Sequence, residues 1–132
     1  MIVDPSALVA IIKDEPDADA FKRALLLADQ PLLSAAGFVE LAMVIDGRRD
    51  PVASHQLDNL ITRTRIRITP VDEKQARVAR QAFRDFGRGS GHPAKLNFGD
   101  CFSYALASVT GHPLLFKGDD FTHTDITPAL KI

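Results

Sequence analysis

Three aspartates occupy positions at which a carboxylate could do chemistry. Asp4 directly follows a short apolar run at residues 2–3, Asp119 follows a second apolar run at residues 114–116, and Asp100 stands near the start of an apolar helical stretch. Parallel sheets form their sites beyond the carboxyl ends of the strands, where loops and helix N-termini meet. Any one of these acids could simply cap a helix or face solvent in a turn. Together they indicate a shared acidic site.

Carboxylates that converge within a few ångströms repel one another and have raised pKa values unless a cation neutralises them. Magnesium prefers carboxylate oxygens and keeps several water molecules that can contact phosphate. A site made only of carboxylates therefore favours metal-assisted phosphate chemistry. The sequence has no P-loop, no GxGxxG or HExxH pattern and no candidate Ser/His/Asp set, so it offers no competing catalytic pattern of comparable quality.

The histidines and the single cysteine do not suggest a second site. None of the histidines, at positions 55, 92, 112 and 123, has a partner three or four residues away, so surface or turn positions are expected for them rather than metal binding. Cys101 has no cysteine or histidine at zinc spacing and is expected to be a small buried helix residue rather than a nucleophile.

The elements that must position the acids are short strands alternating with helices. Apolar runs predict strands, and apolar positions three or four residues apart predict helices, one of which carries Glu40. This alternation predicts an α/β fold in which a short parallel sheet is flanked by helices on both faces. The expected strands are residues 2–3, 32–33, 66–68 and 114–116, and the expected helices include 7–12, one from about 16 to 30, 35–46, one from 51, one from 72 to 86, and 99–111.

The helix that starts near Asp72 has a clear division of faces. Its apolar side chains, at positions 76, 79, 83 and 86, are expected to point inward, and arginines 77, 80 and 84 outward. Arginines 63, 65 and 67 are also expected on a solvated outer face.

Length and composition favour one ordinary globular domain over residues 1–132. Hydrophobic residues make up 45% of the chain and charged residues 25%. The formal net charge of −1 argues against nucleic-acid binding by bulk charge, so any RNA would have to be attracted by local patches. With no apolar run long enough to span a bilayer and no secretory signal, the protein is expected in the cytoplasm.

Four stretches resemble the acidic motifs of PIN-domain nucleases. They are Asp4-Pro5-Ser6, Glu40 within Val39-Glu40-Leu41, Asn97-Phe98-Gly99-Asp100-Cys101, and Gly118-Asp119-Asp120-Phe121. The resemblance runs nearly end to end, and residues 88–100 look most similar to VapC-type toxins.

The resemblance implies a set of site residues. Asp4, Glu40, Asp100 and Asp119 would form the acidic pocket, with Asp4 and Asp100 as direct ligands of Mg²⁺, for which Mn²⁺ could substitute. Ser6 would hydrogen-bond within the pocket and orient a carboxylate or a water molecule.

Two assignments stay open. Asp119 is preferred as the fourth acid because it comes first after the strand, but Asp120 is the alternative. Asn97 either caps the following helix, which is the favoured interpretation, or helps to order the pocket.

The resemblance also implies the activity and the partners. We expect a magnesium-dependent endoribonuclease that acts as the toxin of a toxin–antitoxin pair, forms a homodimer and is silenced by a VapB-type antitoxin. The alternative is a catalytically weak PIN-like module that binds metal or RNA. A haloacid dehalogenase phosphatase is disfavoured because Ser6 stands where that family has its second aspartate.

RNA can approach an acidic pocket only if cations flank it and neutralise the neighbouring phosphates. The candidates are Lys13, Arg48, Arg49, Lys95 and Lys117.

Overall fold

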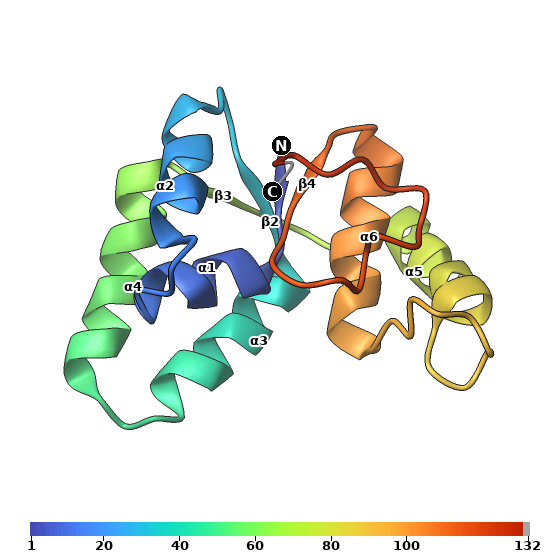
Figure 1. Cartoon of the computed structure of the whole chain (residues 1–132), viewed down its shortest axis with the longest axis horizontal. Coiled ribbons are helices and arrows are strands. Elements are labelled where there is room, and N and C mark those ends of the chain that lie inside the picture. The colour runs from blue at the N-terminus through green and yellow to red at the C-terminus, as the bar shows by residue number, and fades with distance from the viewer. Residues whose placement is uncertain (131–132) are drawn as a thin grey trace.

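The computed structural model describes residues 1–130 as four short strands and six helices in alternation (Figure 1). In chain order the elements are β1 (Ile2–Val3), α1 (Pro5–Ile12), α2 (Ala18–Leu27), β2 (Leu32–Ser34), α3 (Ala35–Asp46), α4 (Pro51–Thr64), β3 (Arg67–Thr69), α5 (Glu73–Phe86), α6 (Phe98–Thr110) and β4 (Leu114–Leu115). The predicted elements are all present, with ends that differ by a few residues.

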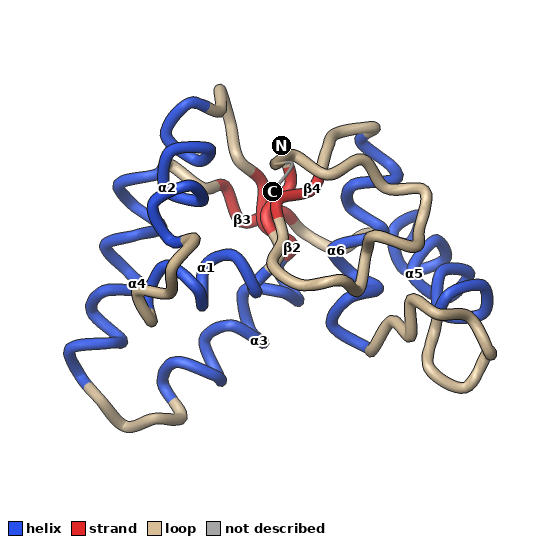
Figure 2. Tube along the Cα trace, in the orientation of Figure 1, coloured by secondary structure: helices blue, strands red, loops and turns tan. Residues whose placement is uncertain are grey.

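The four strands form one parallel sheet in the order β3-β2-β1-β4. Helices α1 to α4 lie on one side of this sheet, and α5 and α6 lie on the other (Figure 2). The predicted α/β fold, a parallel sheet flanked by helices on both faces, is therefore confirmed. Because all strands run the same way, their carboxyl ends share one edge, and α1 and α3 begin directly at that edge.

Alternate residues of each strand face opposite sides of the sheet and so contribute to two separate cores. Val3, Leu33 and Leu115 pack with the buried side chains of α1 to α4. Ile2 and Leu114 pack with α5 and α6 instead. Strands β1, β2 and β4 are thus largely buried, which explains why they appear in the sequence as apolar runs, whereas β3 at the edge of the sheet is largely exposed.

The predicted inward face of α5 is partly wrong. The structure buries Gln75, Ala79 and Ala82, whereas Ala76 and Phe83 are exposed. Helix α5 packs almost entirely on α6, so positions 75, 79 and 82 form its contact stripe. Phe83 lies next to that stripe, near the exposed ring of Phe98, and lines an apolar groove between the two helices.

No helix within residues 1–130 is long and apolar enough to cross a membrane.

Two leucines of α2 provide a matched test of the core packing. Leu25 is 1% exposed and Leu27 is 79% exposed. Replacement of Leu25 by alanine leaves a cavity and should lower the free energy of unfolding by about 2–5 kcal/mol. The control Leu27→Ala should change it by less than about 0.5 kcal/mol. Urea unfolding followed by circular dichroism measures both, and equal effects would contradict the packing described.

Candidate active site

Asp4 lies at the carboxyl end of β1 and is held from both sides of the sheet. It is the N-cap of α1, where its Oδ2 accepts a hydrogen bond from the backbone N–H of Ser6 at 3.0 Å. From α6, the Ser103 hydroxyl donates to Asp4 Oδ1 at 2.6 Å. Both Asp4 and Ser103 are buried, so the carboxylate is fixed in position.

Asp100 is fixed by a capping box at the start of α6. Its Oδ2 accepts from the backbone N–H of Asn97 at 3.0 Å, and the Asn97 side chain accepts from the N–H of Asp100 at 2.9 Å. The favoured interpretation of Asn97 as a helix cap is thereby confirmed. The reciprocal pair satisfies two amide groups that the helix leaves free and positions the Asp100 carboxyl at the positive end of the helix dipole.

Glu40 reaches this helix from α3. Its carboxyl group lies so close to Gly99 that a Cβ atom at this position would clash with it. A larger residue at this position of the first turn of α6 would require the Glu40 carboxyl to move away. The approach places a third carboxylate beside the helix N-terminus, where negative charge is stabilised.

The segment after β4 contributes Asp120 to this group. The Asp120 side chain interacts directly with that of Asp100, and its charge also acts on Asp4. Asp119 does not act on the other acids in this way; it lines a neighbouring hollow and its carbonyl accepts from the Thr122 hydroxyl at 2.7 Å. The structure therefore brings Asp4, Glu40, Asp100 and Asp120 together.

Burial and mutual repulsion shift the titration of these acids. Burial raises the pKa of Asp4 despite hydrogen bonds from Ser103 and Ser6, and the Asp120 charge raises it further. Burial, with repulsion from Asp4 and Asp120, raises the pKa of Asp100 to about 7. Burial, followed by repulsion from Asp4, also raises the pKa of Glu40. The group thus holds protons unless a cation compensates its charge.

Ser6 connects the ends of two strands. Its backbone N–H donates to Asp4, and its Oγ accepts from the backbone N–H of Lys117 at 3.0 Å, just after β4. The contacts agree with the expected orienting function of Ser6, because they tie the Asp4 turn to the segment that carries Asp120.

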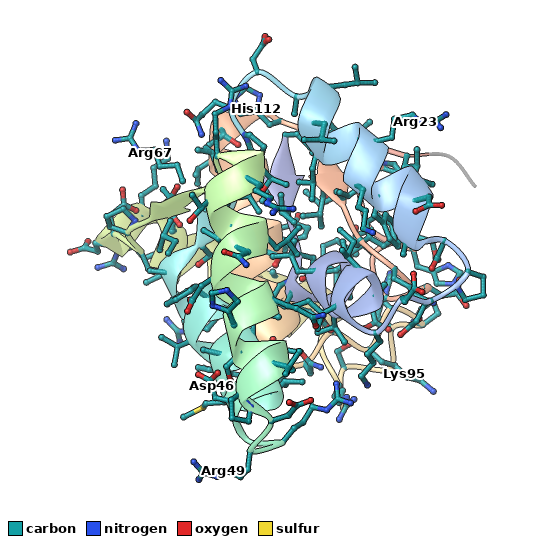
Figure 3. The ribbon with its side chains drawn as sticks, turned by 90° about the vertical axis from the view of Figure 1, so that its left-hand side faces the viewer. Arg23, Asp46, Arg49, Arg67, Lys95 and His112 are labelled. Atoms are coloured by element: carbon teal, nitrogen blue, oxygen red, sulfur yellow. The ribbon has the colours of Figure 1, made fainter. Side chains whose placement is uncertain are left out.

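Lys117 differs from the other candidate cations. Its ammonium group pairs with Glu15, and with Asp17 at 3.2 Å, so it is engaged within the fold. Within residues 1–130, the remaining candidates Lys13, Arg48, Arg49 and Lys95 are exposed and form no ion pair. In Figure 3, Arg49 projects from the bottom of the molecule and Lys95 from its lower right-hand side.

Sequence reasoning missed Ser103. The signal was available, because Ser103 follows Asp100 by three residues and a helix places such positions on the same face. Cys101, by contrast, is buried as expected, and burial raises the pKa of its thiol to about 11. The thiolate that a nucleophile requires is therefore disfavoured.

Comparisons with known proteins show the family of the chain. The PIN domain family matches residues 1–126. The chain belongs to the PIN-domain family. Ribonuclease VapC28 of Mycobacterium tuberculosis is 57% identical to this PIN domain over 130 residues, 98% of each chain. Ribonuclease VapC42 of the same organism is 55% identical over 129 residues, again 98% of each chain. Within the PIN family, the chain is thus a member of the VapC ribonucleases.

Two solved structures have the same fold as this PIN domain. The crystal structure of Mycobacterium tuberculosis VapC20, described as a sarcin-ricin loop cleaving toxin, gives a TM-score of 0.72 at 19% identity and covers 96% of this chain and 95% of its own. A toxin–antitoxin complex from Klebsiella pneumoniae gives a TM-score of 0.72 at 15% identity, with 99% and 98% covered. At these identities the likeness establishes the fold alone.

The site residues of this PIN domain fit the divalent ion that its resemblance implies. All the donors are carboxylate oxygens, which suit Mg²⁺. The buried Ser34 hydroxyl, level with Asp4 on the neighbouring strand, has no hydrogen-bond partner within residues 1–130. Such a group commonly completes its bonding with an ordered water.

In the part of the chain that the structure describes, no three acidic, histidine or cysteine side chains enclose an ion by themselves. Magnesium does not require this, since it is commonly held by one or two carboxylates together with water and substrate phosphate.

The raised pKa of Asp100 predicts a pH-dependent stability of the metal-free PIN domain. Below the ordinary pKa of 3.8, Asp100 is protonated in both the folded and the unfolded chain. Between pH 3.8 and about pH 7, only the folded chain retains the proton. The contribution of Asp100 to the free energy of unfolding therefore falls as the pH rises through this window.

The variant Asp100→Asn removes this pH dependence, and its side chain can still accept a hydrogen bond from the backbone N–H of Asn97. In EDTA, its stability relative to the natural chain should grow from pH 3.8 to about 7. Urea unfolding at stepped pH measures this, and a difference independent of pH would count against the proposed burial of the charge.

Proposed function

We propose that this VapC-family ribonuclease requires Mg²⁺, or Mn²⁺ in its place, and cuts RNA as the cytoplasmic toxin of a toxin–antitoxin pair. The observation that carries the proposal is the convergence of Asp4, Glu40, Asp100 and Asp120 at the carboxyl edge of the sheet. The relatives named VapC ribonucleases, which match over nearly the whole chain, support RNA as the substrate.

Asp4 and Asp100 would hold the ion, since both are buried at the centre of the group and fixed by hydrogen bonds. The bound ion would stabilise the negative charge of the phosphate oxygens and the negative charge that develops on the leaving group. Ser6 and Ser103 keep both oxygens of the Asp4 carboxyl in place, which lowers the reorganisation needed during reaction.

Glu40 is suited to accept a proton. It is more exposed than Asp4 and Asp100, and its raised pKa brings it nearer to the working pH. In the proposed reaction, water forms a bond to phosphorus while the bond from phosphorus to O3′ breaks. A carboxylate oxygen of Glu40 takes a proton of the water, and the leaving O3′ gains a proton from solvent, so the products carry a 5′-phosphate and a 3′-hydroxyl.

The proposed partners are RNA, a VapB-type antitoxin and a second copy of the chain. A homodimer is supported by apolar side chains that stay exposed in the single chain, among them Met43 of α3, Phe83 of α5 and Phe98 of α6. Exposed apolar patches of this kind commonly mark protein interfaces.

Metal-dependent cleavage tests the proposal directly. The purified chain, incubated with total bacterial RNA and Mg²⁺ or Mn²⁺, should produce discrete cuts with 5′-phosphate ends, mapped by sequencing. EDTA should abolish them, and Asp100→Asn should reduce the rate by about 100-fold or more, since it removes charge stabilisation at the reacting phosphate. Folded, metal-binding protein that cuts no RNA would favour the alternative of a PIN-like binding module.

The adjacent aspartates Asp119 and Asp120 form a matched pair. Asp120→Asn should lower the cleavage rate by about 100-fold, because it removes an acid in contact with Asp100. Asp119→Asn should retain most of the cleavage rate, because Asp119 has no such contact. Cleavage rates of the two variants at saturating RNA decide between the two aspartates. A larger loss of rate in Asp119→Asn than in Asp120→Asn would restore Asp119 as the fourth acid.

A further inference from the structure

A hollow of about 700 Å³ lies beside the acidic site and shares one residue, Asp120, with it. Its lining residues come from the loop between α5 and α6 and from the segment that follows β4. The polar side chains that line it are Arg88, His92, Lys95, Asp119, Asp120 and His123. It is separate from the four acids except for the one residue that both share.

We infer that this hollow receives the RNA strand on one side of the cleaved bond, with Arg88 and Lys95 binding its backbone phosphates. The inference rests on the proposed ribonuclease function. It extends that function by assigning where the substrate lies and which side chains position it.

The two cations are available for a ligand. Neither Arg88 nor Lys95 forms an ion pair within residues 1–130, although both lie within a hollow that also has carboxylates. Lys117, which lies two residues before Asp119 in the chain, is instead paired with two acids. Unpaired cations next to a site that must accept a polyanion provide the local attraction that the net charge of the chain does not.

The loop that carries both cations is fixed before any ligand binds. The backbone N–H of Arg88 donates to the Leu96 carbonyl at 3.0 Å, and Leu96 N–H donates to the Phe86 carbonyl at 2.9 Å. The His92 ring packs edge-on against Phe86, and its Nδ1 accepts from the Ala94 N–H at 3.1 Å. This leaves the ring proton on Nε2, free to donate. A wall that is already ordered loses little entropy on binding.

Lys95 occupies a strained position in this loop. Its φ of 52° lies in the left-handed region, and it stands between the buried side chains of Ala94 and Leu96. The two neighbours are anchored in the core while the lysine between them is exposed. Strain of this kind at a non-glycine residue is common where a side chain must be presented to a ligand.

Binding measured in a cleavage-silent background tests the inference. Arg88→Gln and Lys95→Gln, singly and together, would be placed in the Asp100→Asn protein, with Arg23→Gln as the control. Arg23 is an exposed arginine of α2 that lies far from Lys95 in Figure 3. The probe is a fluorescently labelled single-stranded RNA of mixed sequence, titrated at several salt concentrations.

Each substitution in the hollow should weaken RNA binding about tenfold, the equivalent of one charge-assisted hydrogen bond. Each should also flatten the slope of log affinity against log salt by about 0.7, since one phosphate contact is lost. Arg23→Gln should change neither quantity. In the cleavage-competent protein, the double variant should raise KM with little change in kcat, and its affinity for Mn²⁺ by calorimetry should be unaltered.

The outcomes separate this inference from the proposed function. Unchanged RNA affinity and salt slope in the double variant, in a protein whose natural form cuts RNA, would overturn the inference alone. The same result together with weaker binding of the antitoxin would also overturn it, and would identify the hollow as an antitoxin surface. A natural chain that cuts no RNA would contradict the proposed function, while the binding measurements would still decide whether RNA occupies the hollow.

Discussion

The site depends on one buried carboxylate, Asp4, held between the two helical layers. Its oxygens accept from Ser6 of α1 on one side of the sheet and from Ser103 of α6 on the other. A buried charge is stable only where hydrogen bonds or opposite charge replace its hydration. The helices on both sides of the sheet must therefore keep their positions relative to the end of β1. The position of α6 in turn determines where Asp100 lies, so one hydrogen-bonded acid sets the spacing of the others.

Within residues 1–130 no basic side chain forms an ion pair with these acids, and the structure partly offsets their repulsion in another way. Helix N-termini substitute for basic side chains: Asp4 caps α1, Asp100 is in the first turn of α6, and Glu40 contacts that turn at Gly99. Helix dipoles and amide donors stabilise negative charge only partially. The pKa values of Asp4, Asp100 and Glu40 consequently stay raised. A site built in this way retains affinity for a cation, whereas an arginine or lysine in the same place would neutralise it permanently.

The sequence predicted the fold well because its signals are local. Apolar runs, Pro5 and Pro51 at helix starts and Gly111 at a helix end all determine elements within a few residues. The site was harder to predict because its members meet across the chain. Ser103 bonds to Asp4 over 99 positions, and only the layer packing shows that they meet. The inward face of α5 was misjudged for a related reason: the position of α6 decides which of its apolar residues are buried.

The two neighbouring acids after β4 show the limit of sequence reasoning most clearly. Asp119 and Asp120 have the same chemistry and adjacent positions, so order along the strand was the sole guide to the fourth acid. Gly118, whose φ of +97° lies in the left-handed region, directly precedes both acids. The Asp119 carbonyl then accepts from the backbone of Thr122, and the next residue is the one that contacts Asp100. The local conformation after β4, rather than the order along the chain, thus decides which carboxylate lies beside Asp100. Asp119 lines the adjacent hollow together with Arg88 and Lys95, which form no ion pair within residues 1–130. The acidic site therefore lies next to a hollow that has cations as well as carboxylates, and a polyanion cleaved at a cation-binding site needs such flanking positive charge.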